Sequence, residues 1–155
     1  TSPQEGEPPV AESGDTAAED IRPYQFTPPV RENFIETYQE ALNIYEDGNY
    51  GQAMRMFRRL LISDPPVDYA DNAQYWIGEC EFGLQHYGRA LEEFKKVLRY
   101  PNTTKTDDAL IMMASSYIHL NDYNSAREIL DRFQSQYPNS QYVSLARQWM
   151  REYNL

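Results

Sequence analysis

The chain has 155 residues and a formal charge of −10, from 24 acidic and 14 basic residues. Its length suits one domain with a hydrophobic core and is short for two. The acidic balance argues against binding to nucleic-acid backbones and to anionic lipid, because both attract lysine and arginine. No apolar run approaches the length of a transmembrane helix, so we expect no direct insertion into a membrane.

Residues 1–30 are expected to form an acidic, proline-rich linker that is extended or disordered. Up to Asp20 this stretch holds six acids and almost no large apolar side chain, so burial cannot offset its ordering entropy. Residues 21–30 differ, because Tyr24 and Phe26 lie between prolines that favour extended backbone. They are a candidate docking strand, and a plain linker is the alternative. The chain starts at Thr1 without methionine and resembles a mature fragment whose leader was removed.

From residue 31 the pattern becomes helical and repeats. The repeated unit is a tyrosine, an alanine three residues later and a large apolar residue four beyond that. It occurs as Tyr50-Ala53-Phe57, Tyr87-Ala90-Phe94 and Tyr123-Ala126-Leu130. The tyrosines are 37 and 36 residues apart, slightly more than the roughly 34 of simple tetratricopeptide arrays. A second helical segment precedes each unit, with a small residue nine positions before the tyrosine, at Ala41, Gly78 and Ala114.

Small residues at these positions allow two antiparallel helices to cross closely, while aromatic side chains fill the space beside them. Turn-forming residues separate the helices of a pair, and a proline follows each second helix, where it stops the hydrogen-bond ladder. We therefore predict helices over 31–47, 50–63, 70–84, 87–99, 106–120 and 123–136. A seventh helix over 140–152 is expected to cover the open end. The predicted fold over 31–155 is an all-α tetratricopeptide-repeat solenoid of three helix pairs plus a C-terminal capping helix.

Two runs of residues are more specific than the repeat. One reads A-x-Y-W-x-G-E over 73–79, and the other reads Y-P-N-x-x-K-x-x-D-A-L over 100–110. They resemble the C-terminal domain of the periplasmic Tol–Pal accessory protein, the cell-division coordinator of Gram-negative bacteria, from about Asn33 to Asn154. The resemblance implies a periplasmic location, a Tol–Pal partner, and a role in envelope integrity and cell division. Members of that family carry a trimerising coiled coil before the repeats, and no such heptad pattern precedes them here.

A second resemblance is to the tetratricopeptide lipoprotein of the outer-membrane β-barrel assembly machine. It rests on the Y-A-x-x-A linker over 69–73. That protein has more repeats than the three found here. This resemblance implies a lipoprotein anchor as the alternative to a free periplasmic protein.

In the tetratricopeptide fold the first helix of each pair lines a concave groove, which is the expected partner-binding site. The expected groove residues are Ile35, Tyr38, Leu42, Tyr45, Asn72, Tyr75, Glu79, Phe82, Asp108, Ile111, Ser115, Ile118 and His119. Together they form an aromatic and aliphatic channel with a few polar groups, suited to an extended peptide or a helix with apolar anchors. The alternative is that several of these rings pack between neighbouring helices.

One subclass of repeat is excluded by the same positions. Chaperone-type repeats clamp a partner's C-terminal carboxylate with lysine, arginine and asparagine. The corresponding residues here are Tyr38, Leu42, Trp76, Asp108 and Met112. An acidic peptide terminus would therefore meet no cationic clamp.

We expect no catalytic activity, metal or cofactor. His86 and His119 fall in a turn and a helix that the repeat places far apart, and Cys80 is expected to be a packing residue. The acid pairs 92–93 and 107–108 are expected on solvated helix surface or at a cap. No Cys/His cluster has metal-ligand spacing, and no glycine-rich phosphate loop is present.

The sequence thus favours a non-catalytic protein–protein interaction module of the cell envelope that binds a Tol–Pal partner through its concave groove. One alternative is a lipoprotein of the outer-membrane assembly type. Another is a self-associating structural scaffold, a homo-oligomer in which residues 23–30 of the same chain or of a neighbour fill the groove.

Overall fold

The computed structural model of the chain describes residues 33–63 and 65–155. These ranges contain seven α-helices and no strand. The helices are α1 (Phe34–Glu46), α2 (Tyr50–Ile62), α3 (Val67–Gly83), α4 (Tyr87–Val97), α5 (Thr106–His119), α6 (Tyr123–Gln136) and α7 (Val143–Glu152). The predicted all-α fold of three helix pairs and a C-terminal helix is confirmed. The linker predicted over 1–30 lies outside the described residues and stays a prediction.

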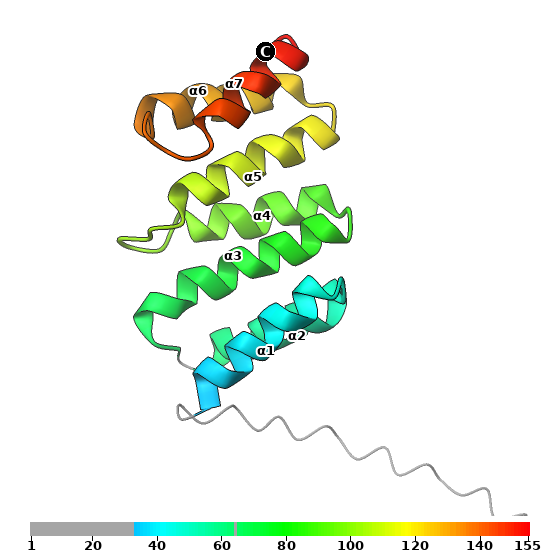
Figure 1. Cartoon of the computed structure of the whole chain (residues 1–155), viewed down its shortest axis with the longest axis vertical. Helices are drawn as coiled ribbons and strands as arrows, with labels where there is room; N and C mark the ends of the chain where they lie inside the picture. The colour runs from blue at the N-terminus through cyan, green and yellow to red at the C-terminus, as the bar shows by residue number, and fades with distance from the viewer. Residues whose placement is uncertain (1–32, 64) are drawn as a thin grey trace, which may run out of the picture.

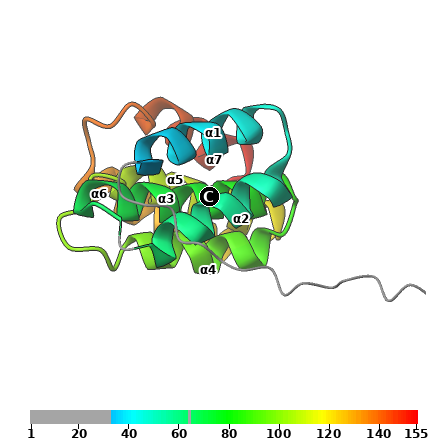
Figure 2. The ribbon, with the colours of Figure 1, turned by 90° about the horizontal axis from the view of Figure 1, so that it is seen from below.

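The helices stack as antiparallel pairs along one axis, α1 with α2, α3 with α4, and α5 with α6 (Figure 1). The first helices of the pairs and α7 lie on one side of the stack, and the second helices lie on the other (Figures 1 and 2). In the view along the stack, α1 and α7 lie above α3 and α5 (Figure 2). We call the side formed by α1, α3 and α5 the inner face.

The turn inside each helix pair has the same geometry. The backbone enters the left-handed region at Gly48 (φ 80°), Gln85 (φ 62°) and Asn121 (φ 58°), which occupy equivalent positions of the three repeats. The residue after each of them donates a hydrogen bond to a carbonyl five residues back, as His86 does to Glu81 at 2.9 Å. This is the C-terminal motif that ends helices with a reversal of handedness, and it explains why turn-forming residues recur at this spacing.

The repeated positions form the core. Ala53, Ala90, Ala126, Phe57, Phe94 and Leu130 are all fully buried, as are Ala41, Ala114 and Cys80. At Gly78 a β-carbon would lie 2.5 Å from Cε1 of Phe94, so the glycine lets that ring pack against the α3 backbone. The predictions that small residues mark the helix crossings and that Cys80 is a packing residue are confirmed.

A second recurring contact joins the loop after a helix pair to the start of that pair's first helix. Thr103 Oγ1 donates a 2.6 Å hydrogen bond to Asp71 Oδ2, and Ser140 Oγ donates a 2.7 Å bond to Asp107 Oδ2. Each hydroxyl follows a Tyr-Pro-Asn sequence. We call these contacts the loop latches. They explain why a serine or threonine and an aspartate recur at these two positions of the repeat.

Removing the first latch is expected to destabilise the domain. Asp71 is only 8% exposed, so Thr103→Val leaves a buried carboxylate oxygen without this donor. Hydrogen bonds to charged groups contribute roughly 1.5–3 kcal/mol, and we expect a loss of free energy of unfolding in that range. Urea unfolding followed by circular dichroism measures it.

Thr104→Val is the matched control, because Thr104 is exposed and should change stability by less than about 0.5 kcal/mol. Equal effects of the two variants would contradict the role of the latch.

The last helix packs on the third pair. Ala146 of α7 is fully buried in one cluster with Leu110 of α5 and with Leu130 and Phe133 of α6. Trp149 packs against the same cluster from α7. The helix therefore takes the place that the first helix of a fourth pair would occupy, as predicted for a capping helix.

Candidate functional site

The predicted groove residues differ widely in accessibility. Ile35 and His119 are exposed, Ile35 to 63%. Seven others are half-buried, namely Tyr38, Leu42, Tyr45, Asn72, Glu79, Phe82 and Asp108. The remaining four are buried, namely Tyr75, Ile111, Ser115 and Ile118. Nine of the thirteen residues thus keep some surface that a partner can reach.

The four buried residues belong to the core rather than to a groove. Ile111 lies in the same hydrophobic cluster as Ala146, because α7 packs over the last pair where a partner would otherwise lie. Tyr75 packs edge-on or tilted against Trp76 and Phe94, with ring centroids 5.7 and 5.6 Å away. The repeat pattern predicts which side of a helix faces inward, but it does not reveal what covers the last repeat.

Six polar side chains meet on the inner face, and we call them the inner-face cluster. Its members are Tyr45, Tyr75, Glu79, Lys105, Asp108 and Tyr142. The Tyr45 hydroxyl donates a hydrogen bond to Glu79 Oε2 at 3.1 Å, which links α1 to α3. The Tyr142 hydroxyl donates to Asp108 Oδ1 at 2.7 Å. Lys105 Nζ lies 3.3 Å from Asp108 Oδ2 and 5.3 Å from the ring centroid of Tyr75.

Glu79 is the least satisfied member of this cluster. Its Oε1 is buried and has no hydrogen-bond partner among the described residues. Burial is the main cause that raises the pKa of Glu79 above its usual value; the Tyr75 and Tyr45 hydroxyls and Lys105 oppose the rise, and the negative charge of Asp108 adds to it. Although Tyr75 lies near enough to affect the pKa of Glu79, no hydrogen bond of standard geometry reaches Oε1.

The tyrosines of the cluster act as hydrogen-bond donors at neutral pH. Burial raises the pKa of Tyr45 and of Tyr75 well above the usual 10. Burial and the neighbouring Asp108 raise the pKa of Tyr142 to about 12. Their hydroxyls therefore stay protonated, and those of Tyr45 and Tyr142 keep donating to Glu79 and Asp108.

The raised pKa of Glu79 predicts a pH-dependent stability. Between the usual pKa of 4.5 and the raised native value, the native state binds more protons than the unfolded chain, so the free energy of unfolding falls as pH rises. Glu79→Gln cannot ionise and keeps an acceptor for Tyr45. We expect it to remove this dependence and to be more stable than the parent at pH 7 by roughly 1 kcal/mol. Urea unfolding at several pH values between 4.5 and 8 measures this; parallel stability curves for the two proteins would contradict it.

An aromatic group lies beside this cluster. The rings of Phe82 and Tyr87 have centroids 5.1 Å apart, and those of Tyr87 and His119 are 4.5 Å apart. His119 Nδ1 is 2.8 Å from the carbonyl oxygen of Ser115, which assigns the proton to Nδ1. We call Phe82, Tyr87 and His119 the aromatic platform. His86 has a different partner, Glu81.

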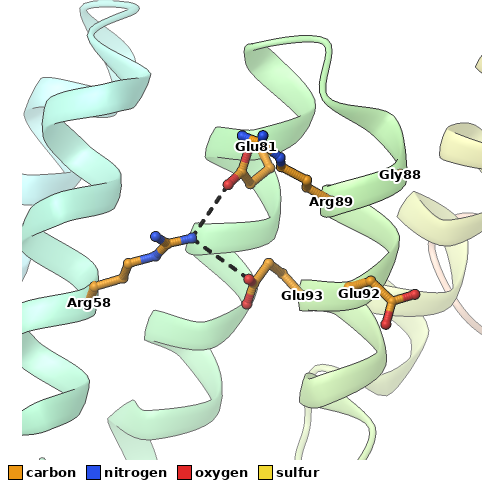
Figure 3. A pocket seen from close by; sticks show the side chains of 6 residues that line it. All are labelled: Arg58, Glu81, Gly88, Arg89, Glu92 and Glu93. Atoms are coloured by element: carbon orange, nitrogen blue, oxygen red, sulfur yellow. Dashed lines mark hydrogen bonds and ion pairs between the residues drawn. The ribbon is translucent and has the colours of Figure 1, made fainter.

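A charged cleft of about 380 Å³ lies on the side of the second helices (Figure 3). Its lining residues are Arg58, Glu81, Gly88, Arg89, Glu92 and Glu93. Arg58 Nη2 lies 3.4 Å from Glu81 Oε1 and 3.7 Å from Glu93 Oε1 (Figure 3). Glu81 is buried, and its other oxygen lies 2.9 Å from His86 Nδ1. We call this site the outer cleft.

The outer cleft corrects one prediction. Glu93 was expected on solvated surface, but its side chain is only 13% exposed. It accepts hydrogen bonds from Gln74 Nε2 at 2.7 Å and from Lys96 Nζ at 2.9 Å. Gln74 comes from another helix, so helix periodicity does not predict its contact with Glu93, whereas Lys96 is the (i, i+3) neighbour of Glu93 along α4. The carboxylates of Glu81 and Glu93 already have basic partners within the chain, so these contacts hold α2, α3 and α4 together.

The described residues give little support for a reactive thiol, a metal site or a membrane-spanning helix. Burial raises the pKa of the Cys80 thiol to about 12, so it carries no thiolate at neutral pH. Among residues 33–63 and 65–155, no three His, Cys, Asp or Glu side chains are grouped so that they could hold a metal ion. Within those same ranges, each helix is too short or too polar to cross a membrane.

Comparison with known proteins identifies the last helix pair. Residues 108–140 match the family described as tetratricopeptide repeat. The chain contains a tetratricopeptide repeat. The match spans most of α5, all of α6 and the loop that follows, and the first two pairs share the repeated positions of this unit. The predicted tetratricopeptide solenoid is confirmed, and repeats of this kind generally mediate protein–protein interaction. No curated protein matches the sequence.

Proposed function

We propose that the chain is a non-catalytic interaction module that binds a segment of a partner protein on its inner face. Tetratricopeptide repeats generally act in this way, which supports the class of function. We choose the inner face as the binding surface because it holds the inner-face cluster and, beside it, the aromatic platform. The face offers accessible rings, which supply much of the binding energy in protein interfaces, and a carboxylate without a full set of partners.

We further propose that the partner is a component of the Tol–Pal system in the periplasm, and that binding supports envelope integrity and cell division. Support comes from the two runs of residues that carry the resemblance, because they meet on the inner face. The first run contributes Tyr75 and Glu79, and the second contributes Lys105 and Asp108. Lys105 Nζ lies over the ring of Tyr75, so one run contacts the other directly.

Titration of the full chain with the periplasmic part of the Tol inner-membrane protein tests this proposal. We expect a dissociation constant below about 100 μM, since an open face gives modest affinity after ordering costs. The double variant Phe82→Ala and His119→Ala is expected to weaken binding roughly tenfold. Arg89→Ala in the outer cleft is the control and should leave binding unchanged. Absence of binding would reject the Tol–Pal partner, and equal binding by the double variant would reject the inner face.

A further inference from the structure

The helices of the inner face are poor in basic residues. Helices α1, α3 and α5 contain nine acidic residues and no lysine or arginine, whereas α2, α4 and α6 contain eight lysines or arginines and four acids. One of the nine, Glu81, reaches the outer cleft and pairs with Arg58. The other eight acidic residues still leave the side of α1, α3 and α5 more negative than the side of α2, α4 and α6. A charge arrangement of this kind attracts cationic partners.

Glu79 is the carboxylate of this face that keeps a buried oxygen without a hydrogen bond among the described residues. Its Oε2 accepts only the Tyr45 hydroxyl, its Oε1 is buried without a hydrogen bond, and no ion pair joins it to a cation of the described residues. A buried carboxylate left in this state costs stability. Residues that break the local rules of folding in this way are expected at binding sites.

The chain itself shows what kind of group the site accepts. Lys105, which directly precedes α5, places its ammonium 5.3 Å from the ring centroid of Tyr75 and 3.3 Å from Asp108 Oδ2. A ring face and a carboxylate together favour a cation. Lys105 satisfies Asp108 in this way; its charge and that of Asp108 both act on Glu79 as well, but no ion pair connects Lys105 to Glu79. The site therefore has two carboxylates and one ammonium.

We propose that Glu79 and Asp108 form a binding site for a lysine or arginine side chain of the partner, so that the segment docking on the inner face is cationic. The partner's cation lies between the two carboxylates and against the half-buried ring of Tyr45, and it competes there with Lys105. This inference rests on the proposed function and gives the chemistry of its ligand. An acidic segment is repelled at the same place.

Three short peptides with blocked ends, identical except for a central arginine, norleucine or glutamate between two phenylalanines, test the site on the full chain. We expect the arginine peptide to bind roughly tenfold more tightly than the norleucine peptide, and the glutamate peptide to bind most weakly. The preference should shrink at high salt. Equal binding of the arginine and norleucine peptides, or no binding of any of the three, would overturn the proposal.

Two variants of the cluster should change the affinity for the arginine peptide in opposite directions. Glu79→Gln is expected to weaken binding towards the level of the norleucine peptide, and Lys105→Met to strengthen it, because the competing ammonium is gone. A purely structural role for both residues would shift both affinities the same way, which would contradict the site. Glu92→Gln and Lys95→Met change an exposed pair on α4 and should have no effect.

The same variants separate this inference from the proposed function. If the Tol partner binds and Phe82→Ala with His119→Ala weakens it, while Glu79→Gln and Lys105→Met do not alter it, the cation site is wrong and the function stands. If the arginine peptide binds as expected and the Tol partner does not bind, the site stands and the Tol–Pal assignment is wrong.

Discussion

Deleting residues 142–155 is expected to unfold the third helix pair while the first pair stays folded. The deletion removes the cover of Leu110, Ile111, Leu130 and Phe133, all of which are buried beside Ala146. Exposing a large apolar side chain costs roughly 1.5–3 kcal/mol, so partial exposure of this cluster costs on the order of 5 kcal/mol. Because each repeat is stabilised mainly by its neighbours, the loss should be greatest next to the cut.

Hydrogen exchange measures this loss helix by helix. Amides of α5 and α6 should lose most of their protection in the shortened chain, and those of α2 should keep theirs. Arg151→Ala, an exposed change on α7, is the control and should leave all helices protected. Full protection of α6 without α7 would contradict the capping role, and complete unfolding of the chain would contradict the local character of the effect.

Alanine at two glycines is expected to have effects of opposite sign. At Gly78 the added carbon would lie 2.5 Å from Phe94 Cε1, and the fully buried ring has no room to move away. Overpacking of this kind costs about 1–3 kcal/mol, and more where nothing can shift, which exceeds the gain in helix propensity. At Gly88 no atom lies within 4 Å of the added carbon. Gly88→Ala should therefore stabilise α4 by roughly 0.5–1 kcal/mol.

Chemical unfolding of the two variants beside the parent checks this pair. Both positions lie in helices, so helix propensity alone predicts the same sign for both. A gain in stability for Gly78→Ala would contradict the close approach of Phe94 to α3. A loss for Gly88→Ala would show that its surroundings are less open than described.

The helices can be predicted from the sequence because the same pattern of residues occurs three times. Each pair has alanine or glycine where its helices cross, a large apolar residue four positions after the alanine of its second helix, and a left-handed residue in its turn. Together these features define both helices of the pair. The ends of the helices are predicted less accurately. The third helix was predicted from residue 70, but α3 begins directly after Pro66, because a proline before the first turn costs no hydrogen bond.

The candidate site follows from sequence only in part. Tyr45, Glu79, Phe82 and His119 were expected on the inner face, and they keep accessible or half-buried positions there. Ile111 was misplaced, because a periodic pattern does not indicate what α7 covers. The contacts of Glu93 with Gln74 and of Lys105 with the ring of Tyr75 were not predicted, since they depend on how neighbouring helices and loops approach each other rather than on spacing along one helix.

Mapping the bound partner onto the surface is the most direct test of the central claim that the inner face is the binding surface. In an isotopically labelled full chain titrated with the periplasmic part of the Tol inner-membrane protein, we expect NMR chemical-shift changes to centre on Tyr45, Glu79, Phe82 and Asp108. Changes centred on Arg58 and Arg89 of the outer cleft, with the inner face unaffected, would contradict the claim.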